Sequence, residues 1–178
     1  MKRSSSIALI MISTSALALS ACDEPQVDAE IYTSLGECAR ESQMSDADCR
    51  EGYLQARRQH GEVAPKYASR EECVADFGEN NCETSSYRTE QGGSVFMPLM
   101  MGYMMGRVLS GGSVAPQPLY RTAGDSSTFR TADNRTVGRS TGPVRVASAA
   151  AKAPSAKSST ISRGGFGATA RASGSATG

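Results

Sequence analysis

The chain has 178 residues, of which 39% are hydrophobic and 6% aromatic, with no Trp and a single His. Gly, Ser, Thr and Ala crowd its second half, so too few large apolar side chains remain for the core of one large enzyme.

The net charge of +1 conceals an asymmetry. Residues 23–90 carry 16 acidic and 7 basic residues, whereas residues 109–178 carry 2 acidic and 9 basic residues. The basic half either binds an anionic partner or keeps a disordered tail soluble. No aromatic residues interleave with its charges to stack on bases, so nucleic acid is not an expected partner.

Residues 1–21 have the features of a bacterial lipoprotein signal peptide. Lys2 and Arg3 are followed by an apolar run over residues 7–19 and then by Leu19-Ser20-Ala21-Cys22. A positive start, an apolar middle and small residues before a cleavage point define a secretory signal. The last four residues match the lipobox, in which Cys22 is linked to diacylglycerol and becomes the new N-terminus. We therefore expect acyl chains at Cys22 to anchor the chain to a membrane.

Asp23 directly follows the lipidated cysteine, which in enteric-type bacteria favours retention at the periplasmic face of the inner membrane. The outer membrane stays open as an alternative. An ordinary cleaved signal or an uncleaved anchor is also compatible with the sequence, although the apolar run is short for a membrane-spanning helix.

Residues 22–90 are predicted to form a small α-helical domain. Residues 32–38 and 67–73 share the pattern Tyr-x-Ser-x-x-Glu-Cys, and residues 45–49 repeat its second half with Asp in place of Glu. Ser followed three residues later by Glu or Asp is typical of a helix capping box. The pattern predicts helices over 35–41, 46–60 and 70–77, with Gly61 and Gly78 as their ends. The expected core residues are Cys49, Tyr53, Leu54, Ala56, His60, Val63, Tyr67, Val74 and Phe77.

Four cysteines remain after lipidation, and a domain this small usually needs covalent support. In an oxidising compartment Cys38, Cys49, Cys73 and Cys82 are expected to form two disulfides. The repeat favours Cys38–Cys49 and Cys73–Cys82, but crossed pairings stay open. A zinc site is disfavoured, because its paired cysteines normally lie two to four residues apart.

Residues 91–109 are rich in Met and Gly and are predicted to form a short apolar helix. We expect this helix to pack on the membrane surface or on a partner protein. The expected contact residues are Phe96, Met97, Met100, Met101, Met104 and Met105. The apolar segment is too short to cross a membrane as a helix. Binding of Cu(I) by the Met thioethers is an alternative.

Residues 110–178 are predicted to be a basic, low-complexity, disordered tail, because they cannot bury enough apolar surface to offset the entropy of ordering them. Within it, residues 163–167 form either a short recognition segment with Phe166 as its anchor or a Gly-rich linker.

The chain resembles the YgiB family of bacterial proteins. The resemblance rests on residues 64–78 with Cys82, on residues 96–100 and 102–107, on residues 117–119 and on residues 163–167. It spans most of the mature chain, although the tail matches only in separate segments. The resemblance implies a lipoprotein and carries no catalytic residue, cofactor or ligand.

The sequence thus predicts a small, mainly α, disulfide-stapled domain followed by a Met-rich helix and a disordered tail. No nucleotide-binding, zinc-protease or serine-hydrolase motif occurs, and His60 on a helix face is more often packed or exposed than catalytic. We expect no enzyme activity, no cofactor and no metal. The expected function is that of a membrane-tethered envelope lipoprotein with a structural or interaction role, and its protein partner is not named by the sequence. The alternative is a periplasmic ligand- or Cu(I)-binding module.

Overall fold

The computed structural model describes residues 24–41, 44–88, 92–106 and 114–155. In these residues the fold is mainly β, so the prediction of a mainly α domain is wrong. A large antiparallel sheet has the strand order β7–β6–β5–β4–β1–β8, and a small sheet pairs β2 with β3. The strands are β1 (Gln26–Tyr32), β2 (Cys82–Arg88), β3 (Ser94–Pro98), β4 (Gly102–Gly106), β5 (Gln117–Thr122), β6 (Asp125–Arg130), β7 (Thr136–Gly138) and β8 (Gly142–Ala147).

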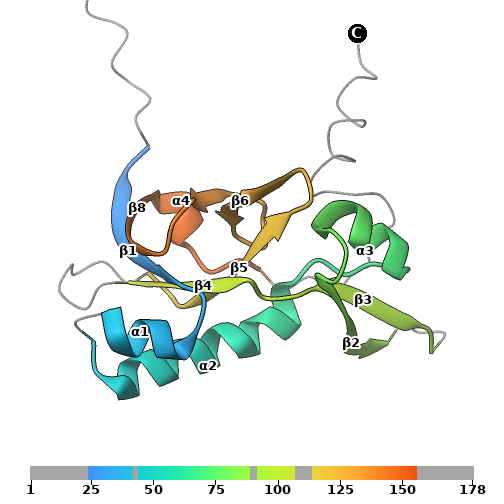
Figure 1. The fold of residues 1–178 in the computed structure, drawn as a ribbon, viewed down its shortest axis with the longest axis horizontal. Helices are drawn as coiled ribbons and strands as arrows, with labels where there is room; N and C mark the ends of the chain where they lie inside the picture. Colours follow the sequence, from blue (N-terminus) through green and yellow to red (C-terminus); the bar gives the residue numbers. More distant parts are fainter. Residues whose placement is uncertain (1–23, 42–43, 89–91, 107–113, 156–178) are drawn as a thin grey trace, which may run out of the picture.

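The large sheet curls until its two edge strands nearly meet (Figure 1). A Cβ atom added to Gly138 of β7 would lie 3.2 Å from Cγ2 of Val144 in β8. The sheet therefore forms an almost closed barrel around an apolar interior. Closure of this kind leaves little of the strand edges exposed. Figure 1 shows α1 and α2 together on one side of the sheet, and α3 with the small sheet at one end.

The helices begin where the Ser-containing pattern predicts. They are α1 (Leu35–Glu41), α2 (Asp46–Val63), α3 (Arg70–Phe77) and the short α4 (Ser148–Ala151). At α2, Ser45 and Asp48 form the complete reciprocal capping box. Ser34 and Ser69 accept only the N–H three residues on, at 3.2 Å each. The C-terminal end of α3 at Gly78 is confirmed by its φ of 91°.

The predicted end of α2 at Gly61 is wrong. The helix continues to Val63. Its end is set instead by Pro65, which disfavours helical backbone at the preceding residue. The extra turn places His60 inside the helix rather than at its last residue.

The Met-rich segment forms strands β3 and β4, not a helix. β4 lies between β1 and β5, and helices cover its outer face. A strand buried on both faces has a continuous apolar sequence, which periodicity alone cannot distinguish from a buried helix. Along β4, Met104 points into the barrel, while Tyr103 and Met105 point to α1 and α2.

The prediction of a disordered tail is wrong for residues 114–155. These residues form β5 to β8 and α4, and β8 pairs directly with β1 at the start of the domain. In this pairing Arg145 lies opposite Asp28, so the basic half of the chain is folded against the acidic half. Residues 156–178, including the segment 163–167, lie outside the described residues.

Both disulfides are present with the pairing that the repeat favours. Cys38–Cys49 joins α1 to α2, and Cys73–Cys82 joins α3 to β2. All four cysteines are buried. Each bridge closes a short loop and is expected to add about 2–4 kcal/mol to the free energy of unfolding.

Three apolar clusters hold the fold together. The barrel interior contains Ile31, Met104, Leu119 and Phe129, and a second cluster fills the layer between the sheet and α1 with α2. The third lies around α3 and the small sheet. The predicted core residues belong to the second and third clusters, with two exceptions: His60 is buried outside the apolar clusters, and Leu54 is 47% exposed.

Two glycines in α2 provide a matched test of how closely this helix approaches β4. Alanine in a helix is more stable than glycine by about 0.5–1 kcal/mol. A Cβ at Gly61 would meet nothing within 4 Å, whereas a Cβ at Gly52 would lie 2.7 Å from Cε of Met105. Gly61→Ala should therefore raise the free energy of unfolding by about 0.5–1 kcal/mol, and Gly52→Ala should gain less, because the end of the buried Met105 side chain must move to make room for the new methyl group.

Urea denaturation of the two variants beside the parent chain measures this difference. An equal gain in both variants would contradict the close packing of α2 on β4.

Candidate functional site

A chain of three polar side chains crosses the junction between α2, β5 and the small sheet. Nδ1 of His60 lies 3.0 Å from the hydroxyl of Tyr120, and Nε2 lies 3.1 Å from Oε1 of Glu83. Tyr120 has no exposed surface and His60 is 3% exposed. The Glu83 side chain, at 37% exposure, connects the chain to solvent.

The donors and acceptors in this chain follow from its chemistry. A carboxylate can only accept, so in neutral His60 the Nε2–H donates to Glu83. Nδ1 then accepts from the hydroxyl of Tyr120. Burial raises the pKa of Tyr120 well above its usual value, which keeps the phenol protonated as this donor.

Burial also lowers the pKa of His60 below its ordinary value of 6.5. The hydrogen bond to Glu83 and the negative charge of that residue oppose this shift, and the positive charges of Arg57 and Lys66 add to it. The neutral imidazole is therefore the form that this junction favours. Protonation would turn Nδ1 into a donor, and Tyr120 could no longer donate to it.

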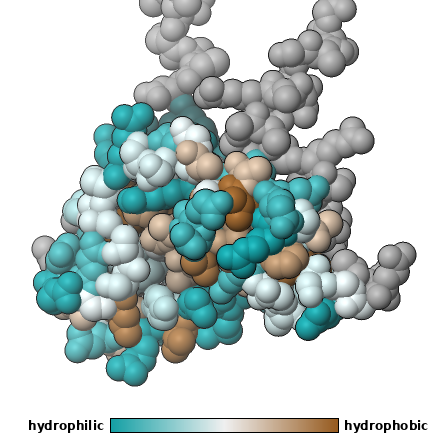
Figure 2. Space-filling view, turned by 45° about the vertical axis from the view of Figure 1, so that its right-hand side comes forward, coloured by the Kyte–Doolittle hydropathy of each residue, from teal (hydrophilic) through white to brown (hydrophobic). Residues whose placement is uncertain are grey.

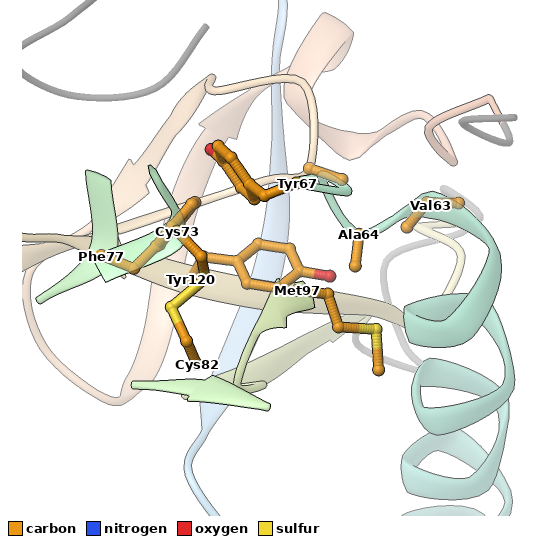
Figure 3. Close-up of a cluster of buried hydrophobic side chains, with 9 residues drawn as sticks. Val63, Ala64, Tyr67, Cys73, Phe77, Cys82, Met97 and Tyr120 are labelled. Atoms are coloured by element: carbon orange, nitrogen blue, oxygen red, sulfur yellow. A yellow bond between two sulfur atoms is a disulfide. The ribbon is translucent and has the colours of Figure 1, made fainter. Parts of the chain in front are cut away.

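A second buried polar pair lies beside the first. The hydroxyl of Tyr67 donates to Oδ2 of Asp76 at 2.8 Å, and both residues are almost fully buried. Burial raises the pKa of Tyr67 above its usual range, and the hydrogen bond to Asp76 and the negative charge of that residue raise it further. Figure 3 shows Tyr120 in the middle of the cluster that also contains Tyr67, Met97 and the Cys73–Cys82 disulfide.

A carboxylate, an imidazole and a hydroxyl in a row resemble the parts of a nucleophilic relay. In a working relay the hydroxyl must reach a substrate. Here the hydroxyl belongs to a fully buried phenol at the far end of the chain from solvent. The arrangement can bind and release a proton, and it ties α2 to β2 and β5.

The whole chain was compared with known proteins. Residues 26–177 match the family profile described as "Protein of unknown function (DUF1190)". The chain belongs to this family.

The curated relatives that match this chain carry the name UPF0441 protein. The chain is 35% identical to that of Yersinia pestis bv. Antiqua, over 93% of this chain and 82% of the relative. It is 34% identical to that of Serratia proteamaculans, over 84% and 74%. It is 33% identical to that of Photorhabdus laumondii, over 90% and 80%. No solved structure matches the chain.

The residues predicted to contact a membrane or partner lie mostly inside this DUF1190 fold. Met104, Met105 and Met97 are buried, each in a different apolar cluster. Phe96 is half-buried and its backbone pairs with that of Tyr67. Met100 and Met101, in the loop before β4, are half-buried. Met104 and Met105 are buried because β4 is an interior strand of the large sheet, and Met97 packs under α3 from the small sheet, so the six side chains do not form one outward apolar face.

Cys22, the predicted lipidation site, lies outside the described residues. Within those residues, no helix is both long and apolar enough to cross a membrane. The same part of the chain holds no group of three or more His, Cys, Asp or Glu side chains placed to share a metal ion.

Sequence reasoning missed Glu83, Tyr120 and Gln117. Gln117 is fully buried, and its Nε2 donates to the carbonyl of Ala150 at 3.0 Å, which holds α4 on the barrel. Glu83 directly follows the disulfide cysteine Cys82, and this position is the only feature of the neighbouring sequence that indicates its contact with His60. Tyr120 and Gln117 lie in the segment that composition marked as disordered.

The polar chain predicts a loss of stability at mildly acidic pH. The folded-state pKa of His60 is below its ordinary value of 6.5. The stabilisation is therefore fully present above that value and is lost as the pH falls below it. The free energy of unfolding should decrease as the pH is lowered from about 7.5 to about 5, and His60→Gln should flatten this dependence.

Chemical denaturation at several pH values tests this expectation. His60 is the only histidine of the chain, so few other groups titrate in this window. The same pH dependence in the parent and in His60→Gln would rule out the assigned role of His60.

Proposed function

We propose that this DUF1190 protein is a lipoprotein of the bacterial envelope, tethered to a membrane by acyl chains at Cys22, with a structural or interaction role and no catalysis. The observation that supports the anchor is the lipobox 19–22 at the end of an apolar run. The two disulfides agree with an oxidising compartment.

The short distance between the anchor and the fold shapes this role. β1 begins at Gln26, four residues after Cys22. An extended chain of that length spans about 14 Å. The barrel of an anchored molecule would therefore stay next to the lipid headgroups. Asp23 supports the periplasmic face of the inner membrane as the location.

The proposal of a non-catalytic role rests on the accessibility of the reactive groups. His60 and Tyr120 are buried and hydrogen-bonded to each other. Catalysis requires groups with tuned pKa values that can reach a bound substrate. In the part of the chain that the structure describes, the one imidazole lacks this access.

The Cu(I)-binding alternative has weaker support, because the thioethers of the Met-rich segment are divided among the apolar clusters. Soft-metal sites need several sulfur atoms that converge on one point. Met97 and Met104 lie in two separate clusters, while Met105 shares a third with Met44 and Met100. The finer resemblance to the YgiB family agrees with the proposed lipoprotein, and it rests on residues 64–78 with Cys82, 96–100, 102–107, 117–119 and 163–167.

Metabolic labelling with an alkyne palmitate tests the anchor. In cells that make the full chain, Cys22→Ala should lose both the lipid label and membrane sedimentation, because no thiol remains to accept diacylglycerol. Ser20→Ala is the matched control, since it keeps a small residue in the lipobox and should stay labelled. A Cys22→Ala chain that is still labelled, or an unlabelled parent chain, would overturn the proposed anchor.

A further inference from the structure

A pocket opens at the end of the barrel where α3, the loop before β4 and the β5–β6 turn meet. Its volume is about 290 Å³, near the lower limit of small-molecule sites. The apolar lining comes from Phe77, Met101 and Ala123, and the polar lining from Asn81, Arg121 and Ser126. Figure 2, turned toward this end of the molecule, shows hydrophobic residues in small groups separated by hydrophilic ones.

Arg121 is the charged group that lines this pocket, and no Asp or Glu of the described residues forms an ion pair with it. Its guanidinium carbon lies 4.0 Å from the centre of the Phe129 ring, so the face of the cation is occupied. Stacking of this kind leaves the N–H groups at the guanidinium edge free to donate. The Nε atom is buried and has no hydrogen-bond partner among the described residues. A buried donor in that condition is costly unless a ligand or water accepts from it.

Two nearby carboxylates are engaged elsewhere. Asp125 accepts from the N–H and the hydroxyl of Ser127, at 3.2 and 2.7 Å. Asp76 accepts from Tyr67 and is 1% exposed. Neither residue lines the pocket, so Arg121 gives the pocket a positive character that no side chain lining it neutralises.

We propose that this pocket binds a small organic carboxylate. Arg121 would donate to the carboxylate, because guanidinium and carboxylate pair with matched geometry. The amide nitrogen of Asn81 donates one N–H to the carbonyl of Phe77 at 2.9 Å. Its second N–H and the hydroxyl of Ser126 supply further donors, and Phe77 with Met101 would cover a short apolar group. The apolar wall favours an organic anion over inorganic phosphate. This inference goes beyond the proposed envelope role and does not depend on the anchor.

Amide chemical shifts of the ¹⁵N-labelled full chain provide the test. N-acetyl-L-alanine is the probe, N-acetyl-L-alaninamide is its uncharged match, and inorganic phosphate is the competing anion. The carboxylate should shift the amides of Asn81, Ala123 and Ser126 in a saturable manner. The uncharged amide should bind at least about tenfold more weakly, because it lacks the charge-assisted hydrogen bond.

Variants assign the binding to this pocket. Arg121→Gln should weaken binding about tenfold or more, and Arg121→Lys should restore part of it. Arg50→Gln, at an exposed position in α2, is the control for overall charge and should bind like the parent. Ser126→Phe, also at an exposed position, should fill the pocket and abolish binding even if Arg121→Gln does not fold.

Several results would overturn the proposal. These are the absence of a saturable shift at millimolar probe, equal binding of the acid and its amide, and tighter binding of phosphate than of N-acetyl-L-alanine. Undiminished binding by folded Arg121→Gln or by Ser126→Phe would have the same effect.

Discussion

The burial of both faces of β4 is the constraint on which the rest of this structure depends. Met104 fills the barrel on one side, and Tyr103 with Met105 contacts the helices on the other. The strand also pairs with β1 and β5, so it joins the first and last thirds of the chain. A single central strand thus links the barrel and the helical layer, because its successive side chains point alternately to one and to the other.

The buried polar groups act at the boundaries between these parts. His60 joins the C-terminal end of α2 to β5 and β2, and Gln117 joins β5 to α4. Tyr67 and Asp76 join α3 to the segment that precedes it. Such contacts add little net stability, but leaving one partner unpaired would be costly, so they favour one arrangement of the elements over its alternatives. The two disulfides act in the same places, where α1 meets α2 and where α3 meets β2.

The chemistry of the molecule is divided between its interior and one end. The groups with the largest pKa shifts, Tyr67 and Tyr120, are buried for structural reasons. Arg121 instead lines an opening at one end of the barrel, and its guanidinium stacks on the ring of Phe129. In this DUF1190 protein, perturbed pKa values and a ligand-sized opening therefore occur at neighbouring but distinct positions.

The sequence by itself determined the features that depend on neighbouring residues. The capping serines at 34, 45 and 69 gave the starts of α1, α2 and α3, because a cap is satisfied within one helical turn. The repeat also favoured the disulfide pairing that the structure has, with partners 11 and 9 residues apart, but the sequence left crossed pairings open. The tertiary structure alone decided the strands. β1 pairs with β8, more than a hundred residues away, and β4 reads as a helix until both of its faces are known to be buried. The Ser- and Gly-rich segment folds because the barrel provides pairing partners and an apolar interior for residues such as Leu119 and Phe129, and composition alone cannot reveal those partners.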